Sequence, residues 1–283
     1  MAQQQLQMQR WELKYIIPEA TALAVRRFCS SYLELDDHGK DDPRLSYPIH
    51  SLYLDSDVLS LYWHTINGNK NRFKLRLRFY DNQPGSPVFF EIKRRMNDAI
   101  LKQRGGVKRE AVDYLLEGQL PRPEHLLSKN PKEMVALQRF CQFLKEFRCK
   151  PKAHVFYMRE AWISPHDNSL RVTLDRDVFI APEHTARLIQ EMDRPVNVFG
   201  KEVILELKFT GRFPNWLGEL VRVFGLTRTT AAKYADGIAL VGEQRFHGKH
   251  TFTAWADPEP AAAEETLGDY STQTETITQQ NES

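Results

Sequence analysis

The sequence predicts an α+β fold, a closed eight-stranded antiparallel β-tunnel with a charged interior and helices covering its exterior. Three observations predict it. Eight stretches alternate with the period of two that is typical of half-buried strands. Each stretch brings charged or hydrogen-bonding residues of one parity to a shared face, and in residues 70–80 the apolar residues take the other parity. Amphipathic helical patterns lie between the strands and can cover an apolar exterior.

The expected strands span residues 10–16, 50–56, 70–80, 88–95, 100–104, 152–163, 170–179 and 202–209. Eight strands suffice to close a small barrel. Helical periodicity is expected at residues 18–33, 131–147, 183–192, 214–224 and 230–242. Three of these segments begin at a proline, a residue that is favoured in the first turn of a helix.

One catalytic domain is expected at residues 10–245. Although the chain has 283 residues, large antiparallel barrels reach this length as single domains. Residues 1–9 are rich in Gln, and residues 246–283 shift to Pro, Ala, Glu, Thr and Gln. Such segments bury too little apolar surface to offset the entropy of ordering, so both are expected to be disordered.

The composition indicates a soluble, cytoplasmic protein. The chain has three cysteines without a zinc or CxxC spacing, which fits a reducing compartment. No signal-peptide core is present, and no stretch approaches 18 uncharged apolar residues. We therefore expect no transmembrane segment, and any membrane role would require a membrane-protein partner. The sequence leaves the oligomeric state open.

The most informative stretch is residues 70–80, KNRFKLRLRFY, in which five basic residues share one parity and apolar residues the other. A solvated strand face would mix both signs, because neighbouring like charges repel. Burying cations without partners is prohibitive. The row therefore predicts an interior that holds water and an anion. The basic residues are Lys70, Arg72, Lys74, Arg76 and Arg78.

The other strands bring charged or hydrogen-bonding side chains to the same interior. A solvated face explains any one strand, but agreement among eight favours the tunnel. A linear chain of phosphates fits best, since Arg offers planar forks and Lys point charges along its length. Four carboxylates, Glu12, Glu91, Asp175 and Glu206, are expected to bind Mg²⁺ or Mn²⁺ or to orient the cations. The remaining inward residues are Lys14, Ser51, Tyr53, Asp55, Lys93, Arg95, Lys102, Arg104, Tyr157, Arg159, Arg171, Thr173 and Lys208.

The motifs RWELKY (10–15), SLYLD (51–55), the basic strand, EIK (91–93) and ELK (206–208) occur in an order that resembles the VTC (vacuolar transporter chaperone) domain. This domain is the polyphosphate polymerase branch of the triphosphate tunnel metalloenzymes. The CYTH branch opens with ExExK, whereas this chain reads Arg10-x-Glu12-x-Lys14, which favours the VTC branch. The resemblance covers residues 10–242. Eukaryotic relatives add an SPX domain and membrane helices, so the chain resembles the stand-alone bacterial form.

The resemblance implies metal-dependent phosphoryl transfer, with polyphosphate made from ATP. It implies that Glu206 helps to hold the metal, and it places Ala232 where relatives often carry Ser. The residues expected to act in catalysis are Lys14, Arg76, Arg78, Lys93, Arg159, Arg171 and Lys208. The residues expected to bind substrate, from the resemblance or from the basic rows, are Arg72, Lys74, Lys102, Arg104, Tyr157 and Lys233.

Two other functions stay open at this point. Hydrolysis of triphosphate or of a nucleoside triphosphate would use the same walls, with water as acceptor. A non-enzymatic polyphosphate or nucleotide sensor would keep the cations and need no metal. Nucleic-acid binding is disfavoured, because it calls for aromatics interleaved with cations, and here they alternate to opposite faces. The acidic segment at residues 36–42 lacks calcium-loop spacing and is expected to be a solvated loop.

Overall fold

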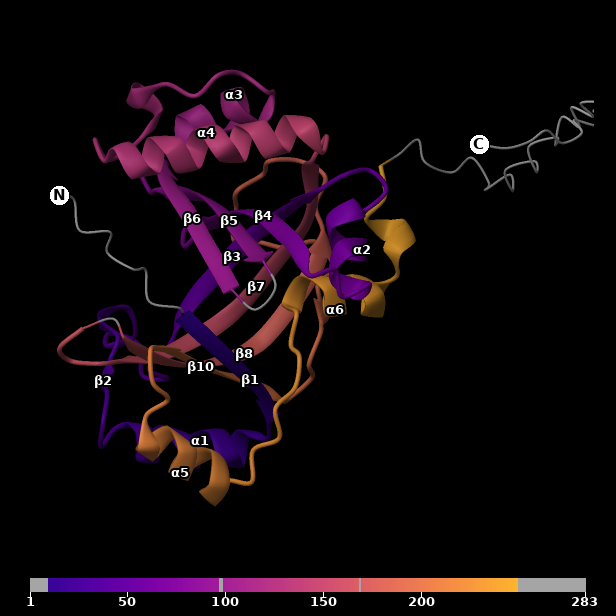
Figure 1. The fold of residues 1–283 in the computed structure, drawn as a ribbon. Coiled ribbons are helices and arrows are strands. Elements are labelled where there is room, and N and C mark those ends of the chain that lie inside the picture. The colour runs from indigo at the N-terminus through magenta and orange to yellow at the C-terminus, as the bar shows by residue number, and fades with distance from the viewer. Residues whose placement is uncertain (1–9, 97–98, 168, 249–283) are drawn as a thin grey trace, which may run out of the picture. The chain divides into compact units, whose positions relative to one another are not determined.

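A computed structural model describes residues 10–96, 99–167 and 169–248. Both segments expected to be disordered therefore lie outside the described residues, apart from residues 246–248. Of these, Phe246 is fully buried. The polypeptide between the two ends forms a large antiparallel sheet with helices packed on its outer side (Figure 1).

The eight expected strands are confirmed and form one hydrogen-bonded path in the order β1-β10-β8-β7-β3-β4-β5-β6, antiparallel at every step. Two short strands lie off this path, β2 on β7 and β9 on β8. The strands are β1 (Arg10–Ile17), β2 (Glu34–Leu35), β3 (Tyr47–Asp55), β4 (Asn71–Phe79), β5 (Val88–Met96), β6 (Ala99–Val107), β7 (Lys150–Ile163), β8 (Leu170–Pro182), β9 (Val196–Asn197) and β10 (Val203–Thr210).

Closure of the sheet into a barrel is not confirmed. Among the described residues, β1 and β6 end the path and no backbone pairing joins them. A ladder would require the two edges to lie about 4.8 Å apart. Here a charged pair bridges this side of the sheet instead, with Lys93 Nζ of β5 lying 3.1 Å from the Glu12 carboxylate of β1. The sheet is curved around its charged face without becoming a continuous hydrogen-bonded cylinder.

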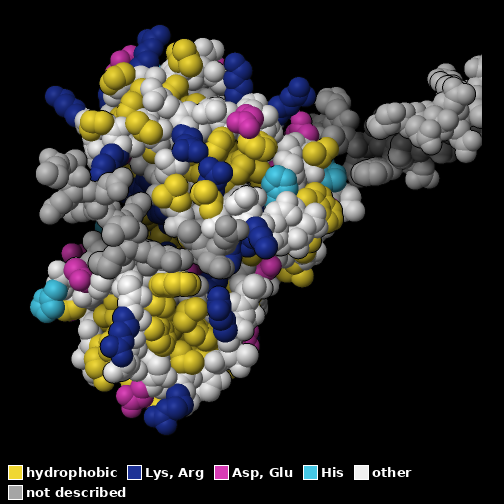
Figure 2. All heavy atoms as spheres, viewed as in Figure 1, with side chains coloured by type: hydrophobic (Ala, Val, Ile, Leu, Met, Phe, Trp, Pro, Cys, Tyr) yellow, Lys and Arg dark blue, Asp and Glu magenta, His cyan; other side chains and the backbone are white. Residues whose placement is uncertain are grey.

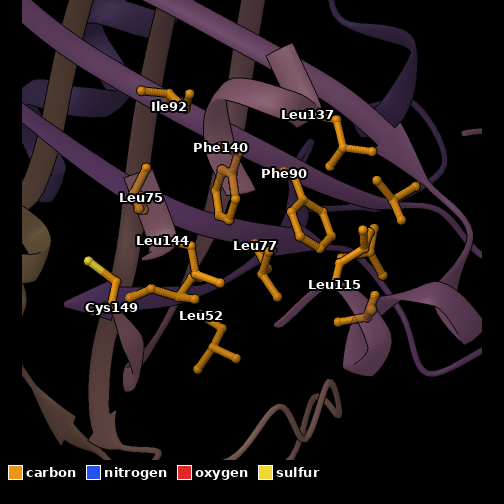
Figure 3. Close-up of a cluster of buried hydrophobic side chains, with 14 of the residues drawn as sticks. Leu52, Leu75, Leu77, Phe90, Ile92, Leu115, Leu137, Phe140, Leu144 and Cys149 are labelled. Atoms are coloured by element: carbon orange, nitrogen blue, oxygen red, sulfur yellow. The ribbon is translucent and has the colours of Figure 1, made fainter. Parts of the chain in front are cut away.

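The alternation within β4 explains how the sheet is covered. Phe73, Leu75, Leu77 and Phe79 are buried on the outer face. Phe140 and Leu144 of α4 (Pro131–Glu146) pack onto this face (Figure 3). At the opposite end, α1 (Glu19–Cys29) and α5 (Asn215–Val223) cover β1, β8 and β10 (Figure 1). Because helices take up the apolar face, the charged face must point inward.

The helix expected at residues 183–192 is wrong, since none forms there. The Glu183 carboxylate accepts hydrogen bonds from the backbone N–H and the hydroxyl of Thr185, which closes a local turn. The Gln190 N–H donates to Asn82 Oδ1, and the Leu188 carbonyl accepts from Arg109. These groups are satisfied by other parts of the chain, so helical hydrogen bonds are not required.

Two helices were not expected, α2 (Ser60–Ile66) and the five-residue α3 (Val112–Leu116). The Asp55 carboxylate accepts from the N–H groups of Leu61 and Tyr62 at 2.9 Å and stabilises the start of α2. Asp55 therefore serves this helix and does not belong to the inner charged face. The last helix, α6 (Lys233–Val241), packs against β8 and begins three residues later than expected.

On the outer surface, Figure 2 shows hydrophobic, basic and acidic side chains interspersed over the visible face. Neither sign of charge covers this face continuously. The near-neutral net charge of +2 is consistent with this mixture. This visible face therefore shows no concentration of positive charge.

We predict that Gly237→Ala destabilises the fold. A Cβ at Gly237 would lie 2.6 Å from Ile180 Cδ1 and 3.2 Å from its Cβ, so α6 would have to move away from β8. The expected loss in the free energy of unfolding is about 1–3 kcal/mol, measured by urea denaturation. Gly218→Ala in α5 is the matched control, because its nearest neighbour would be 3.6 Å away. This control should gain up to about 1 kcal/mol of helix propensity, and equal effects at both sites would contradict the packing argument.

Candidate functional site

The inner face of the sheet encloses a cavity of about 320 Å³. Inward side chains from all eight long strands and from the start of α6 line it. Of the residues expected to act in catalysis, substrate binding or metal binding, Arg72, Glu91 and Asp175 do not line the cavity. Those that do are Glu12, Lys14, Lys74, Arg76, Arg78, Lys93, Lys102, Arg104, Tyr157, Arg159, Arg171, Glu206, Lys208 and Lys233. Lys70, Ser51, Asp55, Arg95 and Thr173, which were expected on the same interior, do not line it.

Two buried carboxylates form a layer behind the lining cations. Glu91 is 1% exposed and accepts from Arg76 Nε at 2.8 Å and Nη2 at 2.7 Å. Asp175 is 0% exposed and accepts both Arg159 Nε and Nη2 at 2.7 Å. Burial alone would raise the pKa of Glu91, but Arg76 and the neighbouring Arg78 hold it well below its usual range. Each carboxylate therefore stays charged and fixes an arginine in place.

Two further carboxylates, Glu12 and Glu206, face the cavity itself. Both lie near Lys14 Nζ, at 3.4 Å and 3.3 Å. Glu206 also contacts Lys208, and lies 3.4 Å from Lys233 Nζ. Burial opposes ionisation of Glu12, yet Lys93 and the other lysines lower its pKa to about 2. These two glutamates are thus ionised and held by lysines that an incoming ligand could replace.

The donor set fits a Mg²⁺ or Mn²⁺ ion that completes its coordination with phosphate oxygens. Such ions commonly use one or two carboxylates together with substrate phosphates and water. Glu12 and Glu206 supply two carboxylates on one side of the cavity. No group of three or more His, Cys, Asp or Glu side chains suited to a metal occurs within the described ranges. An ion held here would therefore depend on the ligand for further oxygens.

Two cations on the lining lack a carboxylate partner within the described residues, Arg78 and Lys74. Arg78 is 6% exposed, donates to the Tyr157 hydroxyl at 3.1 Å, and has a buried Nε without a hydrogen-bond partner. Burial lowers the pKa of Lys74 to about 8, with Lys14 and Lys93 contributing, although Tyr53 opposes the shift. These two groups offer positive charge that no carboxylate in direct contact neutralises, which is the property of an anion site.

Arg171 has a partner that the sequence did not indicate. Its Nη2 lies 2.7 Å from Asp36 and 3.0 Å from the Tyr47 hydroxyl. Asp36 is 8% exposed, so the expectation of a solvated loop is wrong at this residue. The pairing spans 135 positions in the sequence. Only the folded chain brings the loop to β8.

The family model of the VTC domain matches residues 9–242. The chain belongs to the VTC domain family. It is 26% identical over 215 residues to vacuolar transporter chaperone complex subunit 4 of Schizosaccharomyces pombe. That alignment covers 64% of this chain and 30% of the relative, so the chain matches less than a third of the relative's length.

Among solved structures, the VTC domain is similar to a putative adenylate cyclase from Bacillus halodurans. The identity is 14%, the coverage 80% of this chain and 96% of the other, and the TM-score 0.42. A protein from Pyrococcus horikoshii OT3 gives 13% identity, 83% and 99% coverage, and the same TM-score of 0.42. Likenesses this distant carry no argument about activity. Within the described part of the VTC domain, no helix is both long and apolar enough to cross a membrane.

Several lining residues of the VTC domain were not expected. Tyr47 precedes the expected start of its strand, although its parity on β3 matches that of Tyr53 and could have identified it. Ala231 contributes its backbone carbonyl, which accepts from Lys14 Nζ at 2.8 Å. Ala232, where the resemblance leads us to expect Ser, also lines the cavity, so that hydroxyl is missing from this wall.

We predict that Lys74→Met stabilises the VTC domain at about pH 7 by roughly 1–2 kcal/mol, because it removes a buried cation without a carboxylate partner. The pKa of Lys74 is lowered to about 8 by folding, while the unfolded side chain holds its proton up to 10.5. The free energy of unfolding of the wild type should thus rise as the pH increases from about 8 to 10.5. The stability advantage of Lys74→Met over the wild type should shrink over the same range. Urea denaturation at about pH 7 and about pH 9.5 measures both.

Lys233→Met is the matched control with the opposite sign. Lys233 Nζ lies 2.7 Å from Asp175, and although burial opposes it, the carboxylates of Asp175 and Glu206 raise the pKa of this lysine. Removing a partner from a buried ion pair should cost about 2–4 kcal/mol. Stabilisation by both substitutions, or by neither, would contradict the distinction between unpaired and paired lysines.

Proposed function

We propose that this VTC domain binds a chain of phosphates in its cavity and transfers phosphoryl groups there. ATP is the proposed donor, and the end of a growing polyphosphate chain is the proposed acceptor. The observation that carries the proposal is the convergence of basic side chains from the strands on one cavity in which Arg78 and Lys74 lack a carboxylate partner within the described ranges. Membership of the VTC family supports polyphosphate as the product.

The chemistry requires no covalent catalyst from the protein. Phosphoryl transfer depends on holding the attacking and leaving oxygens in line and on neutralising charge on the transferred group. Arg and Lys side chains that are already fixed by Glu91 and Asp175 provide both without reorganising. None of the described residues lining the cavity is a Ser, Cys or His. Direct transfer between phosphates therefore matches this site better than a phosphoryl-enzyme intermediate.

A divalent metal would be held by Glu12 and Glu206. When bound, Mg²⁺ or Mn²⁺ supplies positive charge that neutralises the phosphate oxygens. Lys14 and Lys208 contact Glu206, and they would be available to bind phosphate oxygens if a metal were held by the carboxylates. Of the four carboxylates expected as metal ligands, Glu91 and Asp175 are better suited to orienting arginines.

The defining experiment is incubation of the purified protein with ATP and Mn²⁺, followed by gel separation of the products and a parallel assay for free phosphate. We expect a ladder of polyphosphate chains accompanied by ADP. Free phosphate without chains would replace the proposal by triphosphate hydrolysis. Tight triphosphate binding without turnover would replace it by a sensor function.

We predict that Arg76→Ala and Lys208→Ala each lower kcat by at least about a hundredfold, because each removes a fixed cation from the charged phosphates. Arg222→Ala is the control, since Arg222 lies exposed on α5 and does not line the cavity. Its turnover should equal that of the wild type. Near-normal rates for Arg76→Ala or Lys208→Ala would exclude this cavity as the site of transfer.

For the metal, we predict that Mn²⁺ tightens the binding of tripolyphosphate to the wild type and does so much less for Glu206→Gln. Neutralising the carboxylate removes a hard, charged ligand while keeping its shape. Isothermal titration with and without Mn²⁺ measures the gain for each protein, independently of turnover. Glu183→Gln provides the comparison, because Glu183 lies outside the cavity and binds Thr185 and Arg187. An undiminished gain for Glu206→Gln would reject this ligand assignment.

A further inference from the structure

Three tyrosines on the cavity wall each accept a hydrogen bond from an arginine. Arg76 Nη1 lies 3.1 Å from the hydroxyl oxygen of Tyr53. The other pairs are Arg171 with Tyr47 at 3.0 Å and Arg78 with Tyr157 at 3.1 Å. An arginine has donors only, so each tyrosine oxygen must be the acceptor and its own proton must point elsewhere.

These phenolic protons have no acceptor among the described residues. Two tyrosines outside this set behave differently. Tyr234 donates to Asp55 at 2.8 Å, and Tyr62 donates to Glu243 at 2.9 Å. Because Tyr47, Tyr53 and Tyr157 all line the cavity, a ligand in the cavity is the available acceptor for their protons.

At two of these sites the arginine is already engaged from behind. Arg76 gives Nε and Nη2 to Glu91 and its remaining terminal nitrogen to Tyr53. Arg171 uses the same Nη2 for Asp36 and for Tyr47. At these two positions the arginine and the tyrosine hydroxyl that it contacts both line the cavity. A phenol polarised by a cation is a stronger hydrogen-bond donor to an anion.

Tyr53 is also held rigidly. Its ring stacks on Tyr234 with centroids 4.6 Å apart and an interplanar angle of 15°. Burial opposes ionisation of Tyr53, but Arg76 and Lys74 outweigh it and lower its pKa to about 8. The side chain therefore presents an acidic O–H in a fixed position, with little ordering entropy left to lose when a ligand binds.

The two engaged tyrosines lie far apart along one strand. Tyr47 and Tyr53 are separated by six residues on β3 and share its inner face. At the rise of an antiparallel strand their Cα atoms lie roughly 20 Å apart. Both residues line the same cavity, so a ligand that contacts both hydroxyls must extend along β3. We expect a triphosphate to contact one of them and a longer chain to contact both.

We propose that Tyr47 and Tyr53 donate phenolic hydrogen bonds to phosphates at opposite ends of one linear polyphosphate chain, and that they thereby favour chains longer than triphosphate. This inference rests on the proposed function, because it assumes that phosphate chains occupy the cavity. The cations line the whole cavity and can bind phosphate chains of any length. The two tyrosines would add a preference for longer chains.

The test compares Tyr47→Phe, Tyr53→Phe and the double variant by isothermal titration with tripolyphosphate and with longer linear polyphosphate of defined length. For the longer chain, each single variant should bind roughly ten- to a hundredfold more weakly, and the two losses should multiply in the double variant. For tripolyphosphate, at most one single variant should lose affinity. The double variant should then be no weaker than that single variant.

Tyr62→Phe is the matched control, since it also removes a tyrosine hydroxyl but lies outside the cavity, and it should bind both ligands normally. Equal losses for both ligands would indicate general damage to the cavity and overturn the inference, as would unchanged binding of the longer chain. In either case, wild-type binding of both ligands would leave the proposed function standing. A wild type that binds no phosphate chain would overturn both.

Discussion

The buried cations of the inner face are the constraint on which the rest of the structure depends. A row such as Arg76 and Arg78 repels itself and loses hydration when a sheet curves around it. Glu91 and Asp175 offset part of this electrostatic and desolvation cost. Each lies on the strand next to the arginine that it binds. The compensation is incomplete, because the Arg78 Nε stays buried without a partner. The folded protein thus retains buried positive charge that a bound anion would stabilise.

The same constraint explains the helices. When charged side chains occupy the concave face, most apolar side chains of the strands face outward, where contact with water is unfavourable. The hydrophobic cores therefore lie between the outer face of the sheet and the helices α1, α4, α5 and α6. Gly237 lets α6 approach β8 closely, and this approach carries Lys233 to Asp175. Packing outside the sheet and charge inside it are linked through this helix.

The parity of residues was enough to predict the eight strands and most of the cavity lining, because a strand sends alternate side chains to opposite faces whatever its partners are. Closure of the sheet was not predictable in this way, since it depends on the path of β1 and β6 in space. The ion pair of Asp36 with Arg171 joins a loop to a strand that is distant in the sequence. No periodic pattern in the sequence indicates such a contact. Residues 183–192 have helical periodicity, but Asn82 and Arg109 bind their backbone groups and hold them in another conformation.

Incomplete neutralisation also explains why such a cavity would select an extended polyanion over a compact one. A single phosphate or carboxylate could satisfy Arg78 or Lys74 but would leave the basic side chains farther along the wall in place. A linear polyphosphate carries charge at short, regular intervals and can meet several rigid donors in succession, so each added contact is gained without a further loss of translational freedom. The arginine–tyrosine pairs extend this arrangement along β3, since a hydroxyl fixed by an arginine adds a donor without adding another buried cation. Length recognition can then arise from the spacing of donors along a strand, with the positive charge of the cavity unchanged.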